Sequence, residues 1–93
     1  MADTSRTVEV LVLTQGECKF CDEAKVILDR LATEFPLRIL TDDLNSAKAH
    51  AIALSGGLLF PPGIVIDGRP FSYGRLSEGK LRRELDRRAA AKT

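Results

Sequence analysis

Both cysteines of this 93-residue chain lie in one four-residue segment, Cys18-Lys19-Phe20-Cys21. Two thiols at this spacing can cycle between a dithiol and an internal disulfide, or they can supply half of a tetrahedral zinc site. The chain has one histidine, His50, and no second cysteine pair, so a closed zinc site would need carboxylate ligands. Redox chemistry is therefore the favoured interpretation, and zinc or copper binding through Cys18 and Cys21 is kept as an alternative.

The residues around the cysteines predict where the pair lies in the fold. An apolar, β-branched run at 8–13 predicts a buried strand before it, and a helical apolar stripe predicts a helix after it. That stripe consists of Ala24, Ile27, Leu28, Leu31 and Phe35, and Pro36 ends the helix. With Cys18 at the N-cap, unsatisfied backbone N–H groups and the helix dipole favour its thiolate. Cys21 lies one turn on and is expected to be more buried, so Cys18 is the predicted nucleophile and Cys21 the resolving thiol.

The rest of the chain predicts an α/β domain with element order β-α-β-α-β-β-α and a central four-stranded mixed sheet. Right-handed crossovers predict that the first and third strands are central and parallel. Asp67-Gly68 predicts a hairpin, and Pro70 predicts that the fourth strand lies at an edge. The further expected elements are strands at 37–40, 64–66 and 69–73, a helix at about 46–55, and a last helix after Ser77. In this last helix, the residues expected to be buried are Leu81, Leu85 and Ala89. The ion pairs expected along it are Glu78–Arg82, Arg82–Asp86 and Glu84–Arg88.

The length predicts a single domain over residues 1–93. We further expect it to act as a monomer without cofactor or resident metal. A net charge of +1 gives no reason to expect nucleic acid or an anionic membrane as partner. Because Met1–Arg6 is short and polar and the following apolar run is brief, the expected compartment is the cytoplasm, where thiols are kept reduced. A four-residue disulfide loop would contribute only about 2 kcal/mol as a staple, which also favours redox use.

Two segments resemble the thioredoxin superfamily, and specifically its small glutaredoxin-like members. They are 10–21, with the cysteines, and 62–68, which is similar to the segment where the family has a cis-proline before its third strand. An aromatic before the second cysteine, here Phe20, is similar to glutaredoxins. The resemblance implies a thioredoxin-like fold, with Pro62 as the counterpart of the cis-proline and Pro61 supplying the backbone that faces the substrate. It implies Phe20, Pro61 and Pro62 as substrate-binding residues.

Several positions depart from these relatives, and three of them concern the expected chemistry. Gln15 stands where glutaredoxins carry a glutathione-binding lysine, Val12 stands where thioredoxins carry a buried acid, and Pro61 has no backbone N–H. The sequence therefore predicts a dithiol–disulfide oxidoreductase, acting on protein disulfides or low-molecular-weight mixed disulfides, with an unidentified electron donor. The alternative from a different class is a non-catalytic thioredoxin-like binding module that presents the Pro61-Pro62 groove to a partner.

Overall fold

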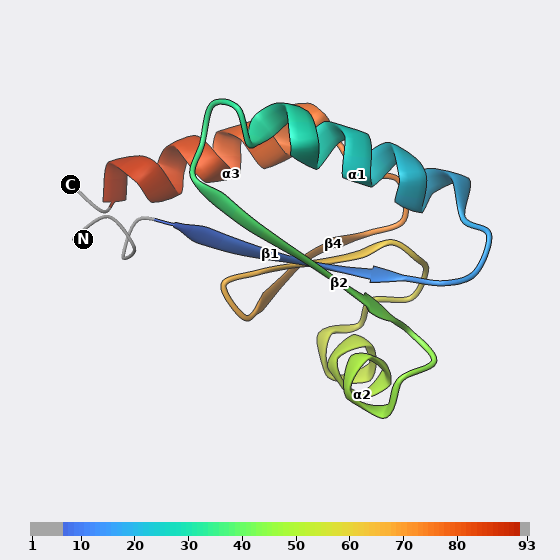
Figure 1. The fold of residues 1–93 in the computed structure, drawn as a ribbon. Coiled ribbons are helices and arrows are strands. Elements are labelled where there is room, and N and C mark those ends of the chain that lie inside the picture. The colour runs from blue at the N-terminus through green and yellow to red at the C-terminus, as the bar shows by residue number, and fades with distance from the viewer. Residues whose placement is uncertain (1–6, 92–93) are drawn as a thin grey trace.

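The computed structural model describes residues 7–91, and the predicted element order is confirmed (Figure 1). The polar segment Met1–Arg6 lies outside the described residues. Within residues 7–91, no helix combines the length and the apolar character needed to cross a bilayer. The elements are β1 (Val8–Thr14), α1 (Lys19–Leu31), β2 (Leu37–Asp43), α2 (Ala47–Gly56), β3 (Gly63–Ile66), β4 (Arg69–Tyr73) and α3 (Glu78–Ala91).

The four strands form one mixed sheet in the order β2-β1-β3-β4. β1 pairs with β2 in parallel and with β3 antiparallel, so the prediction that β1 and β3 are central is confirmed, and the prediction that they are parallel is wrong. The reason is that β2 ends beside Thr14 and β3 starts beside Leu13, at the same end of the sheet. In Figure 1, α2 is seen nearly along its axis, across the direction of the strands, so it does not carry the chain back to the opposite end.

Helices cover both faces of the sheet, α1 and α3 one face and α2 the other (Figure 1). Alternate side chains of β1 point to opposite faces, so Val10 and Val12 pack under α1 and α3 while Leu13 packs against α2. The larger core cluster contains Val8, Val10, Val12, Ala24, Leu28, Leu31, Ile64, Ile66, Leu76, Leu81 and Leu85, and the smaller contains Leu13, Ala49, Ala53, Leu58 and Val65. These two cores fix the position of β1, and β1 leads into the cysteine segment.

Local signals in the sequence set most element ends. Ser46 caps α2 through its hydroxyl, which accepts the Ala49 N–H at 3.1 Å, and Gly57 ends this helix in the left-handed region at φ 67°. The turn between β3 and β4 is at Asp67-Gly68, as predicted. Two expectations about the helices fail. α1 ends at Leu31, with Ala32 as its C-cap, and not at Pro36. At the far end of α3, Ala89 is exposed, because in Figure 1 the last part of α3 extends past the start of β1.

Candidate active site

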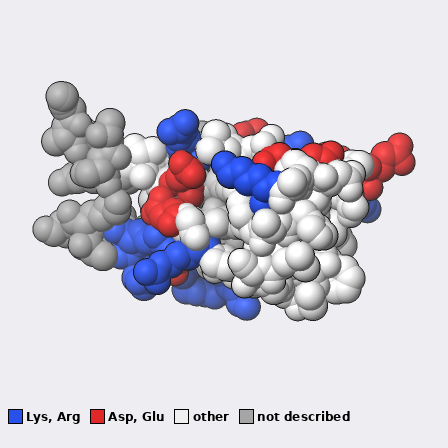
Figure 2. Space-filling view, turned by 90° about the horizontal axis from the view of Figure 1, so that it is seen from below, with Lys and Arg blue, Asp and Glu red and all other residues white. Residues whose placement is uncertain are grey.

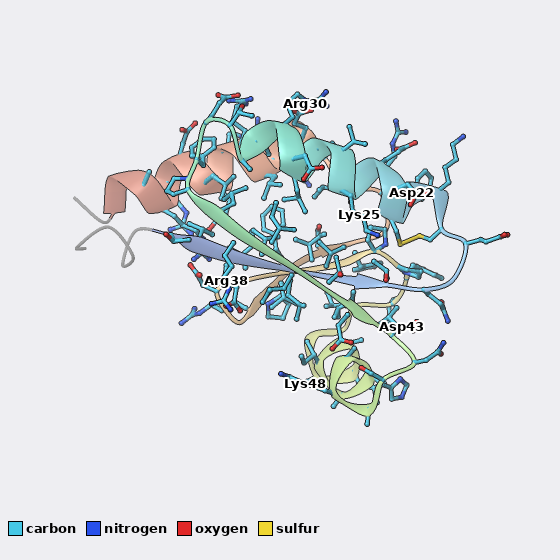
Figure 3. All side chains as sticks on the ribbon, viewed as in Figure 1. Asp22, Lys25, Arg30, Arg38, Asp43 and Lys48 are labelled. Atoms are coloured by element: carbon cyan, nitrogen blue, oxygen red, sulfur yellow. A yellow bond between two sulfur atoms is a disulfide. The ribbon has the colours of Figure 1, made fainter. Side chains whose placement is uncertain are left out.

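The cysteine pair lies at the junction of β1 and α1. Three exposed residues, Gln15-Gly16-Glu17, follow the strand, and Cys18 is the N-cap of α1 with an extended backbone (φ −138°, ψ 104°). Cys18 and Cys21 are joined by a disulfide, and their Cα atoms are 5.1 Å apart, which lies within the usual range for such a bond. Figure 3 shows the yellow disulfide at the start of α1, at the end of the sheet where β1 ends. The structure therefore shows the oxidised form of the protein.

Cys18 caps the helix with its sulfur. The Cys21 N–H donates a hydrogen bond to Cys18 Sγ at 3.1 Å, and the Asp22 N–H donates to the Cys18 carbonyl at 3.1 Å. N–H groups in the first turn of a helix have no partner further back in the chain, so the sulfur satisfies one of them. In the reduced protein, the same N–H groups and the positive end of the helix dipole stabilise negative charge on this sulfur. The position therefore favours the thiolate of Cys18 over its thiol.

The two sulfurs differ in their access to solvent. Cys18 is half-buried, whereas Cys21 is 2% exposed and belongs to the face of α1 that packs on the sheet. A large disulfide substrate can therefore approach Cys18 far more easily than Cys21. The arrangement can support attack by Cys18 from outside and displacement by Cys21 from inside.

The two charged side chains next to Cys18 in the sequence have opposite signs. Glu17 and Lys19 flank it, and both are exposed to solvent. Within residues 7–91, the only hydrogen bond that Cys18 Sγ accepts is the one from Cys21. Val12, six residues before Cys18, is fully buried and apolar, so that position carries no group for proton transfer. The helix terminus therefore stays the predicted source of thiolate stabilisation at Cys18.

The proline loop lies at the same end of the sheet. Gly63 pairs with Leu13 near the end of β1, so Pro62 lies beyond it, toward the cysteine segment. The peptide bond between Pro61 and Pro62 is cis, as expected for the family counterpart. Pro62 is fully buried and Pro61 is half-buried. The loop is therefore held at the edge of the site with Pro61 as its more accessible member.

A contact from β4 fixes this loop, and no pattern in the sequence indicated it. The Gly74 N–H donates to the carbonyls of both Phe60 and Pro62 at 3.1 Å, and Gly74 has a left-handed backbone (φ 75°). The rings of Phe60 and Tyr73 lie 6.1 Å apart between centroids, within the range of favourable aromatic pairs. The end of β4 therefore supports the proline loop through both backbone and ring contacts.

Apolar side chains are unusually exposed around this end of the molecule. Phe60 is 63% exposed, Leu59 67% and Tyr73 44%, and Phe20 in the first turn of α1 is 42% exposed. Of these, only Phe20 is a residue that the sequence predicts at the site. In the sequence, the apolar run Leu58-Leu59-Phe60 before the prolines is the signal that could have indicated this exposed surface. In the structure, Leu58 is the buried member of this run. These four exposed side chains are called the apolar rim below.

A pocket of about 390 Å³ lies beside the loop that precedes Cys18. It is lined by Gln15, Leu44, Asn45, His50, Ala53, Leu54, Gly57, Leu58 and Leu59. Among residues 7–91, no lysine, arginine or carboxylate lines it, so none of these residues replaces Gln15 with a fixed cation there. His50 is exposed on α2, as the sequence predicts for a solvated residue. Figure 2 looks onto the α2 side and shows a broad, nearly uncharged area over this helix.

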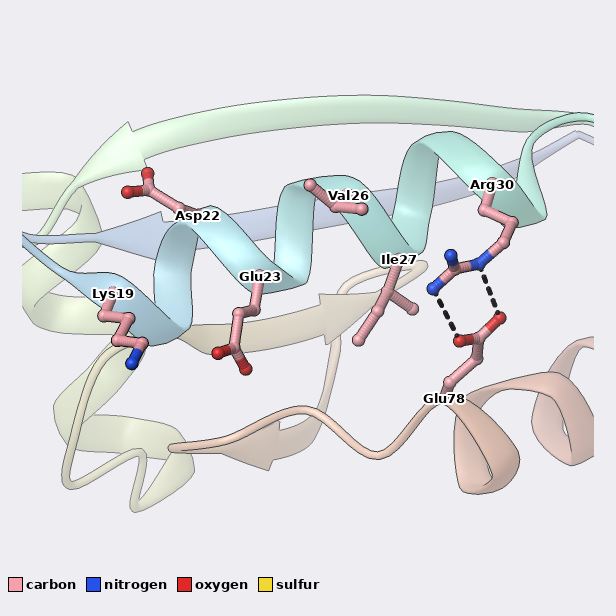
Figure 4. A pocket seen from close by; sticks show the side chains of 7 residues that line it. All are labelled: Lys19, Asp22, Glu23, Val26, Ile27, Arg30 and Glu78. Carbon is pink, nitrogen blue, oxygen red and sulfur yellow. Dashed lines mark hydrogen bonds and ion pairs between the residues drawn. The ribbon is translucent and has the colours of Figure 1, made fainter.

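A second hollow, of about 420 Å³, lies on the outer side of α1 and does not include either cysteine (Figure 4). It is lined by Lys19, Asp22, Glu23, Val26, Ile27, Arg30 and Glu78. Figure 4 shows Arg30 and Glu78 closing one end with a two-bond ion pair, at 3.1 and 2.9 Å. This pair joins α1 to the start of α3, so the hollow is explained as the seam between two helices.

The structure therefore brings the predicted residues Cys18, Cys21, Phe20, Pro61 and Pro62 to one end of the sheet, on the α1 start and the loop before β3. It adds Phe60, Tyr73 and Gly74, whose importance depends on contacts between β4 and the proline loop. Among residues 7–91, no group of three or more His, Cys, Asp or Glu side chains is arranged to hold a metal ion.

Comparison with known proteins gives a clear result for the fold and none for a named family. No protein-family model matches the chain, and no curated protein matches it. Among solved structures, an uncharacterised thioredoxin-like protein from Clostridium perfringens has a TM-score of 0.71 at 17% identity, covering 88% of this chain and 71% of that one. A single-site mutant of thioredoxin from Halobacterium salinarum has a TM-score of 0.67 at 19% identity, with coverage of 88% and 74%. This chain has the fold of the thioredoxin superfamily.

A third solved structure, the oxidised thioredoxin from Plasmodium falciparum, has a TM-score of 0.62 at 9% identity, with coverage of 95% of this chain and 86% of that one. At these identities the likeness concerns the fold alone. The thioredoxin fold of this chain places a disulfide-forming pair, Cys18 and Cys21, at the start of its first helix. Fold and cysteine pair together fit a redox role.

Proposed function

We propose that this chain is a thiol–disulfide oxidoreductase that reduces disulfides in other molecules through Cys18 and Cys21. The reduced Cys18 thiolate attacks one sulfur of a substrate disulfide, forming a mixed disulfide and expelling the other sulfur as a thiolate that takes a proton from solvent. Cys21 then loses its proton and attacks Cys18 Sγ, which releases the remaining substrate sulfur as a thiol. The substrate gains two electrons, and the protein is left with its internal disulfide.

The observation that carries the proposal is the capping position of Cys18. Its sulfur already accepts the Cys21 N–H at 3.1 Å, and Cys21 is 2% exposed behind it. An ordinary cysteine, with a pKa of about 8.5, is only about 3% thiolate at neutral pH, so stabilising the thiolate directly increases the reactive fraction. Burial of Cys21 protects the second thiol from outside reagents and leaves it one helical turn from the first. The same two features support the division of roles between the cysteines.

We propose Phe20, Pro61 and Pro62 as substrate-binding residues: Phe20 and Pro61 form the accessible surface, and the buried Pro62 follows Pro61 in the loop. Because Pro61 has no N–H, it offers an extended substrate only its carbonyl, so pairing of the β-augmentation kind is reduced to an acceptor. The apolar rim supplies the remaining contact area, and its exposed aromatic side chains favour apolar residues next to the substrate disulfide. A disulfide in a protein presents such residues, so we place protein disulfides ahead of low-molecular-weight mixed disulfides.

Regeneration needs an external thiol or dithiol that reduces the Cys18–Cys21 disulfide. The pocket beside Gln15 is lined by no lysine or arginine of residues 7–91, which argues against a reductant held through a carboxylate, as in glutathione-dependent glutaredoxins. Small size and the aromatic residue at Phe20 support a glutaredoxin-like relationship within the superfamily. A dithiol enzyme of this kind works in a reducing compartment, so the cytoplasm is the proposed location.

Turnover of a disulfide substrate tests this function. With dithiothreitol as reductant and a protein disulfide as substrate, the unmodified chain is expected to accelerate reduction. Cys18→Ser is expected to abolish this activity, because the attacking sulfur is lost. A chain that shows no turnover, or a Cys18→Ser variant that keeps its full activity, contradicts the proposal. A binding module would instead keep its biological activity in Cys18→Ser, and a metal site would carry zinc or copper in the anaerobically purified protein.

A further inference from the structure

The two edges of the sheet differ in how they are protected against pairing with another strand. At one edge, β4 carries Pro70, which donates no hydrogen bond, and its pairing with β3 shifts register between Ile64 and Val65. At the other edge, β2 runs for seven residues, Leu37–Asp43, without a proline, and its pairing with β1 is continuous. Within residues 7–91, no strand pairs with the outer side of β2. β2 is therefore the open edge of this sheet.

The hydrogen bonds to β1 show which backbone groups of β2 face outward. The Pro36 carbonyl accepts the Val8 N–H at 2.9 Å, and the Leu44 N–H donates to the Thr14 carbonyl at 2.8 Å. The N–H and C=O groups of one residue point to the same side of a strand, and this side alternates from residue to residue. The backbone groups of the even-numbered residues of β2 therefore face β1. The odd-numbered residues, Ile39 and Thr41 among them, present their N–H and C=O groups to the open side.

The side chains of β2 are complementary to those of a second, antiparallel β2. When Leu40 is placed opposite Leu40 of a second copy, Arg38 of each strand lies directly opposite Asp42 of the other. In this register Ile39 and Thr41 form the hydrogen-bonded pair, in agreement with their outward backbone groups. Arg38 and Asp42 then occupy the non-hydrogen-bonded positions, where side chains are closest. Opposite charges at such positions stabilise a sheet, and like charges destabilise it.

We propose that β2 is a homodimer interface, in which two copies pair their β2 strands antiparallel about a two-fold axis at Leu40 and form one continuous sheet. Within residues 7–91, Arg38 forms no ion pair, so its guanidinium is free to meet the Asp42 carboxylate of the second copy. Asp42 Oδ1 accepts the Asp43 N–H at 2.8 Å, which leaves its other oxygen for the arginine. Because the Asp43 N–H already donates this bond, the strand pairing between the two copies runs only from Arg38 to Asp42. This proposal replaces the monomer that the sequence predicts.

The dimer leaves both cysteine pairs accessible. Each disulfide lies at the end of the sheet where β1 and β2 end, and antiparallel pairing places the two disulfides at opposite ends of the joined sheet. Arg38 and Asp42 belong to neither the cysteine segment nor the proline loop. The inference is independent of the proposed function, since association and disulfide turnover are measured separately.

Sedimentation equilibrium at protein concentrations up to about 1 mM tests the interface, because a single pair of edge strands buries little area and associates weakly. The unmodified chain is expected to dimerise, and less so at about 1 M salt, where charge pairs are screened. Arg38→Asp and Asp42→Arg are each expected to be monomeric, because each places like charges opposite one another. An equimolar mixture of the two variants is expected to dimerise again, since both cross-strand pairs then have opposite charges.

The mixture distinguishes loss of the interface from loss of folding, because two unfolded variants do not restore dimerisation when they are mixed. Arg69→Asp, the same charge change on β4 at the protected edge, is the matched control and is expected to remain dimeric. A monomeric unmodified chain at about 1 mM overturns the proposal. Dimers that persist in both single variants overturn it too, as does a mixture that stays monomeric while both variants give folded circular dichroism spectra.

Discussion

The capping role of Cys18 makes a stability prediction that is separate from catalysis. Cys18→Ser and Cys18→Ala both remove the disulfide, so its contribution cancels between them. Serine keeps an oxygen that can accept the Cys21 N–H, which Cys18 Sγ now accepts at 3.1 Å, whereas alanine leaves that donor in the first turn of α1 without a partner. Replacing a good N-cap residue with alanine typically costs about 1 kcal/mol. The serine variant is therefore expected to be more stable by about that amount.

Urea and thermal denaturation of the two variants, followed by circular dichroism, measure the difference. In a domain of this size, about 1 kcal/mol corresponds to a difference in Tm of roughly 4–8 °C. Ser55→Ala is the matched control, because Ser55 is exposed in the last turn of α2, where alanine is the better helix former. That control is expected to leave stability unchanged or to raise it slightly. Equal stability of Cys18→Ser and Cys18→Ala, or a more stable alanine variant, refutes the capping argument and with it the proposed source of thiolate stabilisation.

Three further predictions concern the thiol, the proline loop and the surface ion pairs. Ultraviolet titration of the reduced protein is expected to give a Cys18 pKa below that of an ordinary cysteine, and a value of about 8.5 or higher contradicts the helix-terminus argument. Gly74→Ala is expected to lower the free energy of unfolding by about 1–2 kcal/mol in urea denaturation, because its left-handed backbone, and not lack of space, disfavours a Cβ; no loss of stability contradicts this. The Arg82 hydrogen bond at 2.6 Å holds the Glu34 pKa below its usual range. This pair therefore stabilises the folded protein above the pKa of an unfolded glutamate, and the stabilisation is lost as the pH falls through the lower pKa of Glu34 in the folded state. Denaturation from about pH 6 to about pH 3 is expected to show a smaller acid loss in Arg82→Gln, and an identical profile contradicts the assignment.

The local signals of the sequence proved reliable at the site itself. The N-cap position of Cys18, the burial of Cys21 and the Asp67-Gly68 turn are all confirmed, because each depends on neighbouring residues and on helix or turn geometry. The cis bond before Pro62 agrees with the family counterpart that the resemblance implies. Spacing along the chain was sufficient for the N-cap, the buried cysteine and the turn, whereas the cis bond is what the resemblance implies for Pro62.

The features that the sequence missed depend on contacts between distant segments. The direction of β3 depends on how α2 crosses the sheet, which periodicity does not specify. Of the three ion pairs expected within α3, only Glu84–Arg88 forms, at 2.7 Å. Glu78 instead pairs with Arg30 and Arg82 with Glu34, because α1 and its following turn lie alongside α3 and offer these partners.

The support of the proline loop also depends on contacts that the sequence does not show. Phe60 and Tyr73 are far apart in the chain and meet only because β3 and β4 form a hairpin that returns the chain to the loop. Gly74 could be recognised in the sequence as a turn residue, but its two hydrogen bonds to the loop could not. Such contacts determine the shape of the substrate surface, so specificity is the property that sequence patterns describe least well.

Trapping of the mixed disulfide tests the central claim, that Cys18 attacks and Cys21 resolves, most directly. Reduced Cys21→Ser is mixed with a peptide disulfide, and the adduct is located by mass spectrometry of the proteolysed protein. The proposed roles predict a stable mixed disulfide on Cys18 in this variant, and little adduct on the buried Cys21 in Cys18→Ser. Equal or faster adduct formation on Cys21, or no adduct on Cys18, contradicts the account.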